Sequence, residues 1–461
     1  MVWKEVDTGT WVDDLDGAEK VFYNMSQAFK GLGKEHGSVY TVCKINVQGS
    51  GPKSPSEIIL RNAWKLLRFE FPALSVMVED SKKKYLVATA DRVEQWAKET
   101  FIVETMLSVN EIVPTLHLRK LPCLIYLPSS SEIIFHASHW RIDALGACMI
   151  LNRLFDLVTR CTEGYTIQQW SLEPQNLSPS LEDAFGSPKT YSPAMEAMAQ
   201  SIRKRNFETS YPSAGLPYNG DITRKPAMSR NEATQFTVKS TKDLIASCRE
   251  HKISVTAAIH AACAKTVFDR SKHNNHNYST VVSANVREYL PVPQHKNTEA
   301  SPAYSCGTYV TGITHTLRRA DDYAARSSQL TEAYRGDWNV MEYMVALRPI
   351  YRVHGEALAD VARPGTRTPA SNVTVSSLGI IEKYLKSEHD GIVVEGFRLG
   401  SAIMTRQPTL YIWTFRNHLT ISIDFNEAYY STEVVRDLLK SVIDCLESEL
   451  QITIEVGKGT E

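Results

Sequence analysis

The chain has 461 residues, enough for two or three domains with full hydrophobic cores. Hydrophobic residues make up 43% and charged residues 22% of the sequence, a composition typical of globular proteins that excludes an intrinsically disordered chain. Lysine and arginine number 51 against 52 aspartate and glutamate residues, so the net charge is -1 and no basic field favours nucleic acid or an anionic membrane.

No segment of the sequence predicts membrane insertion or secretion. The longest apolar stretch, 253–267, is interrupted by His260 and Lys265 and is shorter than a membrane-spanning helix. The first 16 residues are acidic, whereas a signal peptide begins with basic residues before an apolar core. The eight cysteines occur singly, without a Cys-x-x-Cys pair. We therefore expect a cytoplasmic protein with free thiols, no membrane insertion and no nucleic-acid partner.

The first half of the chain alternates between short strands and amphipathic helices, as judged from the spacing of its apolar residues. The expected strands cover 38–47, 74–78, 85–88, 122–127 and 132–138. The expected helices cover 57–71, 92–101 and 143–158. Pro72 ends the first of these helices, because proline cannot continue a helix from that position.

The second half follows a stretch rich in Ser, Pro, Asn and Gly, 164–227, in which one helix is expected at 194–205. The expected strands beyond it cover 234–239, 278–286, 305–312, 373–378, 392–397, 410–415 and 419–425. The expected helices cover 241–251, 256–269, 320–335, 340–361 and 431–448.

The order of these elements predicts the α+β fold class, with two α/β two-layer sandwich domains of similar size. A Rossmann fold or a barrel would need a regular alternation of strand and helix, which neither half provides. We expect an N-terminal domain at 1–180, a connection at 181–226 and a C-terminal domain at 227–461.

Common nucleophile and phosphate motifs are absent from the sequence. It contains no Gly-x-Ser-x-Gly elbow and no Walker A loop. The glycine-rich segment 31–37 has the wrong spacing for a dinucleotide-binding fingerprint and does not follow an expected strand. Serine hydrolases, P-loop enzymes and dinucleotide-binding proteins are therefore excluded.

The most informative segment joins the strand at 132–138 to the following helix. His139 lies on the short turn, and Asp143 follows where the helix begins. A histidine held between two elements can project into a cleft, as a general base must. Each residue also has a purely structural interpretation: His139 as a hydrogen-bonded histidine at a strand end and Asp143 as a helix N-cap. A metal site with His136 is disfavoured, because residues three apart at a strand end point to opposite faces.

This segment resembles the HxxxD acyltransferase superfamily, which includes BAHD enzymes, chloramphenicol acetyltransferase and the condensation domains of peptide synthetases. Further similar segments follow in the expected order at 60–74, 255–263, 285–291, 306–307 and 376–379. Within the superfamily the chain is most similar to the fungal trichothecene 15-O-acetyltransferase group, particularly at 423–431. Ser138 stands where many members carry a first histidine.

The resemblance implies two chloramphenicol-acetyltransferase-like domains with a tunnel between them. It implies an acyl-CoA-dependent O-acyltransferase, in particular an O-acetyltransferase, acting on a hydroxyl of a fungal secondary metabolite such as a trichothecene-like sesquiterpenoid. Acyl-CoA would be a cosubstrate, with no metal or other cofactor, and the protein would be a monomer. Two alternatives remain: a condensation-type enzyme with a carrier-bound acyl donor, and a non-catalytic member that binds a ligand.

The resemblance also implies roles for individual residues. His139 would be the general base, and Asp143 would pair with Arg287 in a bidentate contact that supports the catalytic turn. Three further residues are candidates for the oxyanion or substrate pocket: Ser376, Ser377 and Asn426.

Overall fold

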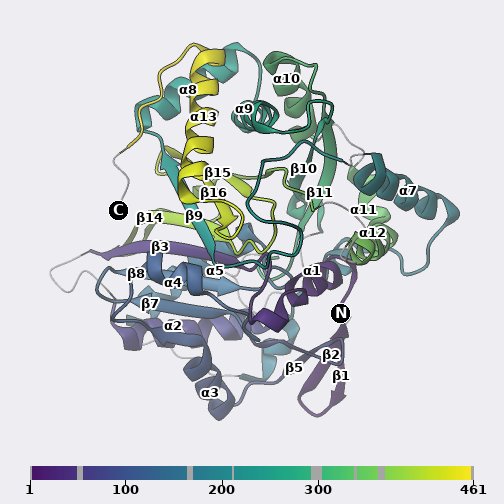
Figure 1. Cartoon of the computed structure of the whole chain (residues 1–461). Helices are drawn as coiled ribbons and strands as arrows, with labels where there is room; N and C mark the ends of the chain where they lie inside the picture. The colour runs from purple at the N-terminus through teal and green to yellow at the C-terminus, as the bar shows by residue number, and fades with distance from the viewer. Residues whose placement is uncertain are drawn as a thin grey trace. The chain divides into compact units, whose positions relative to one another are not determined.

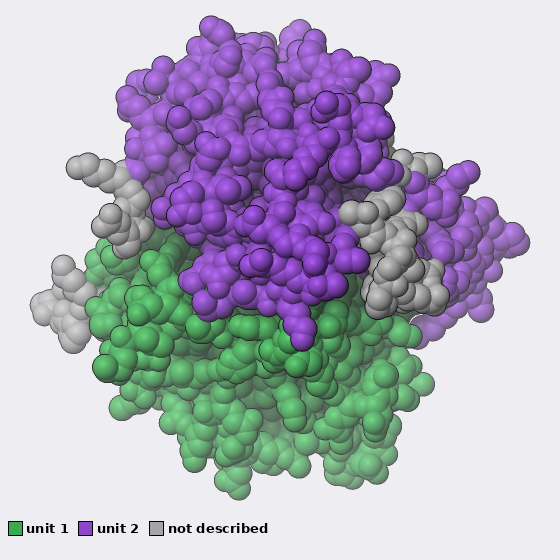
Figure 2. Space-filling view, in the orientation of Figure 1, with its two compact units in different colours: residues 1–188, 287–309, 381–401 green, residues 189–286, 310–380, 402–461 purple. Residues whose placement is uncertain are grey.

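The computed structural model describes residues 3–48, 55–162, 170–209, 212–291, 304–336, 340–361 and 369–457, to which all structural statements below refer. Residues 163–169 of the expected N-terminal domain and 210–211 of the expected connection lie outside these residues. The chain divides into two compact units, coloured separately in Figure 2. Unit 1 comprises Met1–Pro188, Arg287–Tyr309 and Ile381–Ser401, and unit 2 comprises Lys189–Val286, Val310–Ile380 and Ala402–Glu461.

The units differ from the expected contiguous domains, because two segments of the C-terminal half belong to unit 1. One of them contains strand β14 (Ile392–Ser401), which pairs antiparallel with β3 (Val39–Val47). The other begins at Arg287 and ends at Tyr309. Both segments therefore belong to the unit that carries His139.

The main sheet of unit 1 has the strand order β13-β14-β3-β8-β7-β6. The bounds of its remaining strands are β13 (Glu388–His389), β8 (Glu132–Ala137), β7 (Cys123–Leu127) and β6 (Phe101–Val103). Only the β6–β7 pair among these described strands is parallel. A smaller sheet, in the order β1-β2-β5-β4, contains β1 (Lys4–Asp7), β2 (Thr10–Asp14), β5 (Lys82–Leu86) and β4 (Met77–Glu79).

Unit 1 contains the helices α1 (Gly17–Gln27), α2 (Glu57–Glu70), α3 (Ala90–Thr100), α4 (Val109–Ile112), α5 (Ala144–Thr162) and α6 (Leu181–Phe185). Helices α2 and α4 lie on opposite faces of its main sheet. On one face, Phe135 of β8 contacts Trp64 of α2 edge to face. On the other, Ile134 packs with Val109 and Ile112 of α4. Because alternate side chains point to opposite faces, β8 is buried on both sides and holds the following turn firmly.

The sheet of unit 2 has the strand order β11-β10-β12-β15-β16-β9. The strands are β9 (Ser229–Gln235), β10 (Tyr278–Asn285), β11 (Val310–Leu317), β12 (Thr374–Ile380), β15 (Thr409–Phe415) and β16 (His418–Asn426). Strand β12 runs parallel to both of its neighbours, and the other pairs are antiparallel.

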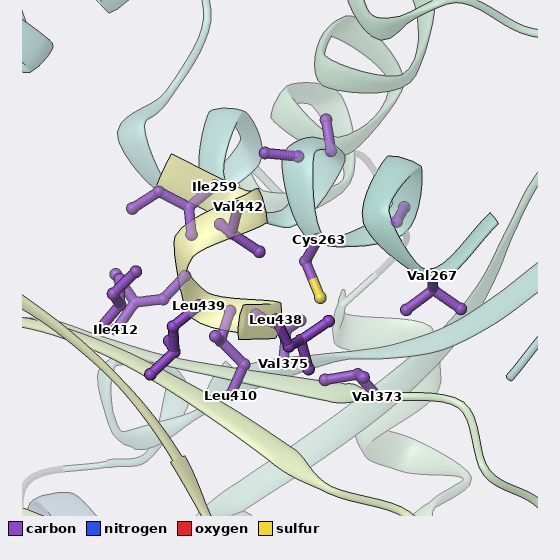
Figure 3. Close-up of a cluster of buried hydrophobic side chains, with 14 of the residues drawn as sticks. Ile259, Cys263, Val267, Val373, Val375, Leu410, Ile412, Leu438, Leu439 and Val442 are labelled. Carbon is purple, nitrogen blue, oxygen red and sulfur yellow. The ribbon is translucent and has the colours of Figure 1, made fainter. Parts of the chain in front are cut away.

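Four helices of unit 2 pack around one large apolar core: α8 (Val238–Glu250), α9 (Val255–Arg270), α10 (Tyr323–Tyr334) and α13 (Thr432–Leu450). The other helices of the unit are α7 (Pro193–Lys204), α11 (Val340–Val345) and α12 (Leu347–Val361), and α7 packs with α12. Figure 1 shows α8, α9 and α13 on the same side of the strands. In Figure 3, Cys263 of α9 and Leu439 of α13 point toward Val375 and Leu410 of the sheet. This packing explains why α9 is apolar nearly all round.

The expected fold class is confirmed, since each unit combines a mixed six-stranded sheet with packed helices. Four predicted elements are wrong in position. The strand expected at 74–78 begins as a 3-10 helix, Pro72–Ser75, and β4 starts only at Met77. Strand β9 ends at Gln235, because Thr237 caps α8. Strand β11 begins only at Val310, and the helix expected at 340–361 is broken into α11 and α12. No described helix is long and apolar enough to cross a membrane.

Candidate active site

His139 lies at the centre of a tight turn between β8 and α5. The main-chain N–H of Arg141 donates to the carbonyl oxygen of Ser138 at 3.0 Å, which closes a β-turn with His139 and Trp140 at its central positions. The hydroxyl of Thr308 donates to the carbonyl oxygen of His139 at 2.6 Å. Both contacts fix the backbone that presents the imidazole.

The imidazole of His139 is half-buried and stacks on Phe22 of α1, with ring centroids 4.3 Å apart and planes inclined by 7°. Burial lowers the pKa of His139, while the Asp143 carboxylate and the residue's own main chain raise it to a smaller extent. The neutral imidazole is therefore favoured near pH 7. A neutral imidazole can accept a proton, which a general base must do.

Asp143 combines a helix cap with an ion pair. Its Oδ1 accepts from the main-chain N–H of Gly146 at 2.8 Å, which caps α5, and its Oδ2 accepts from the N–H of Tyr309 at 2.8 Å. Nη2 of Arg287 donates to both carboxylate oxygens, at 2.8 and 2.9 Å. One nitrogen makes both contacts, whereas the expected bidentate fork would use two; Nε of Arg287 donates instead to the carbonyl oxygen of Tyr304.

Two glycines allow the segment around Tyr309 to approach the turn closely. A Cβ atom added at Gly146 would lie 2.2 Å from the carbonyl oxygen of Ser305 and 3.3 Å from Nη2 of Arg287. Gly307 has a φ of +148°, and a Cβ atom there would lie 2.5 Å from the Tyr309 ring. Side chains at either position would push this segment away from Asp143.

Several residues around the turn were not predicted from the sequence: Phe22, Glu35, Gly146, Thr308 and Tyr309. A signal for α1 is nevertheless present, because Asp16 and Glu19 form a capping box at its start. That motif, followed by apolar residues, could have identified the helix that carries Phe22. No local pattern indicates Thr308 or Tyr309, which reach the turn from a distant part of the chain.

The other candidate residues belong to unit 2. Ser376 and Ser377 lie half-buried on β12, and the hydroxyls of Ser377 and Thr256 are 2.8 Å apart. Asn426, at the end of β16, is 0% exposed. Its Nδ2 donates to the carbonyl oxygens of Ala227 and Ile403, at 3.1 and 2.8 Å.

The oxygen of the Asn426 amide is also occupied. Oδ1 accepts from the main-chain N–H groups of Ala227 and Ala428, at 2.9 and 3.1 Å. Both N–H donors of the amide therefore already bind carbonyl oxygens, which corrects the expectation that Asn426 could serve as an oxyanion donor. The contacts instead tie three segments of unit 2 together.

The described side chains form no group of three or more His, Cys, Asp or Glu residues that could hold a metal ion. His136, considered above as a ligand, points from β8 toward the α4 side of the sheet, with Ile134. Burial and the nearby Arg119 and His117 lower the pKa of His136 to about 3.

The two α+β units share their fold with a solved acetyltransferase structure. The solved structure of TRI3 trichothecene 15-O-acetyltransferase from Fusarium sporotrichioides matches with a TM-score of 0.78 and 17% identity, covering 96% of this chain and 97% of that one. No protein-family model matches the chain.

Curated relatives define the family more closely. O-acetyltransferase pigM of Monascus ruber is 40% identical over 461 residues, covering 99% of this chain and 88% of pigM. Azaphilone biosynthesis cluster protein M of Aspergillus terreus is 33% identical, covering 96% of both chains. The chain therefore belongs to this family of fungal O-acetyltransferases.

Proposed function

We propose that the protein transfers an acetyl group from acetyl-CoA to a hydroxyl of a fungal secondary metabolite, with His139 as the general base. The observation that carries the proposal is the neutral imidazole on a turn fixed by Thr308 and Asp143. The family of O-acetyltransferases to which the chain belongs supports the reaction class.

The reaction needs one base and two bound substrates. His139 accepts the proton of the alcohol as the alcohol oxygen attacks the thioester carbonyl carbon. The tetrahedral intermediate then collapses, the C–S bond breaks, and the imidazolium returns the proton to the CoA sulfur. Because both substrates are bound together, no acyl-enzyme is required, and the proximity of the reacting groups lowers the barrier. The thioester supplies the driving force without a metal or redox cofactor.

Asp143 supports the turn in this proposal and takes no part in proton transfer. Its two oxygens already accept hydrogen bonds from Gly146, Tyr309 and Arg287. Ser376 and Ser377 remain the candidates for stabilising the oxyanion, since hydroxyl groups can donate to the developing charge.

The acceptor that we favour is an azaphilone-type alcohol. The relative at 33% identity is named as a member of an azaphilone biosynthesis cluster, whereas the trichothecene enzyme shares the fold at only 17% identity. The first expectation, a trichothecene-like sesquiterpenoid, is therefore the second class to test. We further propose that the enzyme acts as a monomer in the cytoplasm, which light scattering and a fluorescent fusion would test.

The decisive test begins with acetyl-CoA binding measured by calorimetry on the purified protein, with free CoA as competitor. Release of CoA thiol is then followed with azaphilone-type and sesquiterpenoid alcohols. His139→Ala should retain acetyl-CoA binding and lose about 10²- to 10⁴-fold in turnover, the usual contribution of a general base. Full activity of His139→Ala would refute the proposed base. Absence of acetyl-CoA binding at millimolar concentration would favour a carrier-bound donor or a non-catalytic protein.

A further inference from the structure

Glu35 lies next to the turn that carries His139. It belongs to the glycine-rich segment 31–37, which is not a dinucleotide-binding motif, and it is 3% exposed. The hydroxyl of Ser138 donates to Oε2 of Glu35 at 3.0 Å. Ser138 directly precedes His139, and its carbonyl oxygen accepts the hydrogen bond that closes the turn. The carboxylate is thus one hydrogen bond away from the backbone of the catalytic turn.

Arg141 lies at the other end of the same turn and is also buried. Its guanidinium donates to the carbonyl oxygens of Val76 and Lys120, with 2.6 Å to the latter. These acceptors are uncharged. Glu35 acts on the cation through its charge, without an ion pair of 4.0 Å or less among the described residues. Glu35 exerts the strongest anionic influence on Arg141, ahead of three other groups: Cys306, Tyr23 and Glu19.

We propose that Glu35 is a positioning residue, whose ionised carboxylate holds Ser138 and Arg141, on either side of His139 and Trp140, in the geometry that acetyl transfer requires. The proposal rests on the function proposed above, because His139 must be the base. It extends that function to a residue that acts on the turn through Ser138 and Arg141.

The charge on Glu35 changes near neutral pH. Burial raises the pKa of Glu35 to about 7, although the Ser138 hydrogen bond and the Arg141 charge lower it in part. Arg141 is the charged group that acts on this carboxyl among the described residues, and Tyr23, Glu19 and Cys306 act on Arg141 in turn. Below pH 7 the carboxyl becomes neutral and the buried guanidinium loses its main counter-charge. We therefore expect turnover to rise with pH through about 7, separately from the titration of His139 at lower pH.

Kinetics of three variants test this role. Glu35→Gln keeps the acceptor for Ser138 but removes the charge, so kcat at pH 8 should fall about tenfold with little change in the KM for acetyl-CoA. The rise in kcat near pH 7 should also disappear. Glu35→Asp keeps the charge and should still show the rise in kcat near pH 7. Ser138→Ala should lower kcat at every pH but should keep that rise.

Glu182→Gln is the matched control. Glu182 is likewise buried in unit 1 and its pKa is raised to about 8. It accepts from the main-chain N–H of Ala18 at 2.8 Å, and neither Ser138 nor Arg141 is among the groups that shift its pKa. This variant should keep the rise in kcat near pH 7. Loss of the rise in both glutamine variants would show that any buried carboxyl produces it and would overturn the proposal.

Hydrogen exchange measures how well the main-chain amides of the turn are protected in the absence of substrate. Exchange in the peptide spanning 138–143, corrected for the intrinsic effect of pH, should be several-fold faster at pH 6 than at pH 8 in the wild type. In Glu35→Gln it should be fast at both pH values. If the wild type transfers no acetyl group, the proposed function fails, but this measurement still decides whether Glu35 holds the turn. Equal protection of wild type and Glu35→Gln at both pH values would overturn the positioning role.

Discussion

The two units bury polar groups in different ways. Unit 1 contains ion pairs in which both side chains are almost fully enclosed. They are Lys83 with Asp13 and Glu19, Arg153 with Glu70, and Arg287 with Asp143. The ion pairs described in unit 2 each keep at least one side chain more than a tenth exposed, as in Arg230 with Glu427 at 37% and 32%.

The buried polar groups of unit 2 lie outside such enclosed ion pairs. Its buried charged side chains include Arg326 and Arg406, which donate to main-chain carbonyl oxygens, and other buried groups are neutral. His260 lies between the hydroxyls of Tyr334 and Thr280, at 3.0 and 2.9 Å, and burial lowers its pKa to about 3, so the ring is uncharged near pH 7. The Asn426 amide satisfies four main-chain groups. These groups connect elements without the cost of removing a charge from water.

This difference predicts where substitutions of charged residues will destabilise the protein most. Removing one partner of a buried ion pair leaves an uncompensated charge and costs about 3–5 kcal/mol, whereas an exposed pair contributes about 0–1 kcal/mol. The buried charges of unit 1 include Asp143, Arg287 and Arg141, which surround the His139 turn. Charge changes in unit 1 should therefore affect stability and turnover together.

The largest effect is expected for Asp143→Ala, which leaves Arg287 without its carboxylate and α5 without its cap. Urea unfolding should show a loss of about 3–5 kcal/mol. Asp143→Asn, which can still accept from Gly146, should lose less. Arg230→Ala in unit 2 is the matched control and should lose at most about 1 kcal/mol. A fully stable but inactive Asp143→Asn would contradict the support role and would indicate a direct role in proton transfer.

Asn426→Ala should have the next largest effect. The substitution removes the partner of two buried main-chain groups, the carbonyl of Ile403 and the N–H of Ala428, and of two part-buried groups of Ala227. We therefore expect a loss of about 2–4 kcal/mol in the free energy of unfolding. The side chain of the exposed Asn277 makes one hydrogen bond, accepting from the N–H of Arg319 at 3.2 Å, and Asn277→Ala should cost less than about 1 kcal/mol. If Asn426→Ala lost turnover while keeping full stability, the amide would have a chemical role after all.

Gly146→Ala tests the close approach of Ser305 to the start of α5. The new methyl group would lie 2.2 Å from a carbonyl oxygen, and overpacking of this kind costs about 1–3 kcal/mol. Gly31→Ala is the control, because a Cβ atom there meets nothing within 4 Å. Thermal unfolding should separate the two variants by several degrees. Equal melting temperatures would mean that the segment around Tyr309 can move away at little cost.

Local sequence patterns predicted the elements that present His139. The apolar runs that became β7 and β8, and the helical spacing of α5, place a turn before Asp143 without any tertiary information. The end of α2 was equally predictable, because Pro72 follows it.

Contacts between distant parts of the chain could not be predicted in the same way. Strand β14 pairs with β3 across most of the sequence, and periodicity contains no information on such partners. The segment before β11 reads as a strand, but Thr308 and Tyr309 make their hydrogen bonds with His139 and Asp143 instead. The tertiary contacts of the turn thus override local strand propensity.

The smallest expected effect is the pH dependence of stability that arises from two buried histidines, one in each unit. Burial lowers the pKa of both His136 and His260 from 6.5 to about 3. The unfolded chain takes up a proton at pH 5.5 while the folded imidazole stays neutral, so stability decreases as the pH falls. Each histidine should contribute a loss of about 1 kcal/mol between pH 7.5 and 5.5. His136→Leu and His260→Leu should each remove the part of this pH-dependent loss that the replaced histidine contributes. Urea unfolding at pH 7.5 and 5.5 measures it.

The two leucine variants should also differ in their free energy of unfolding at pH 7.5. Neither ring nitrogen of His136 has a hydrogen-bond partner among the described residues, so His136→Leu should be neutral or stabilising. His260→Leu leaves the hydroxyl groups of Tyr334 and Thr280 without their hydrogen-bond partner and should lower the free energy of unfolding by about 1–3 kcal/mol. The exposed His273 provides a control, since His273→Gln should leave the free energy of unfolding at pH 7.5 unchanged. A destabilised His136→Leu would mean that this imidazole contributes to unit 1 through an interaction that apolar packing cannot replace.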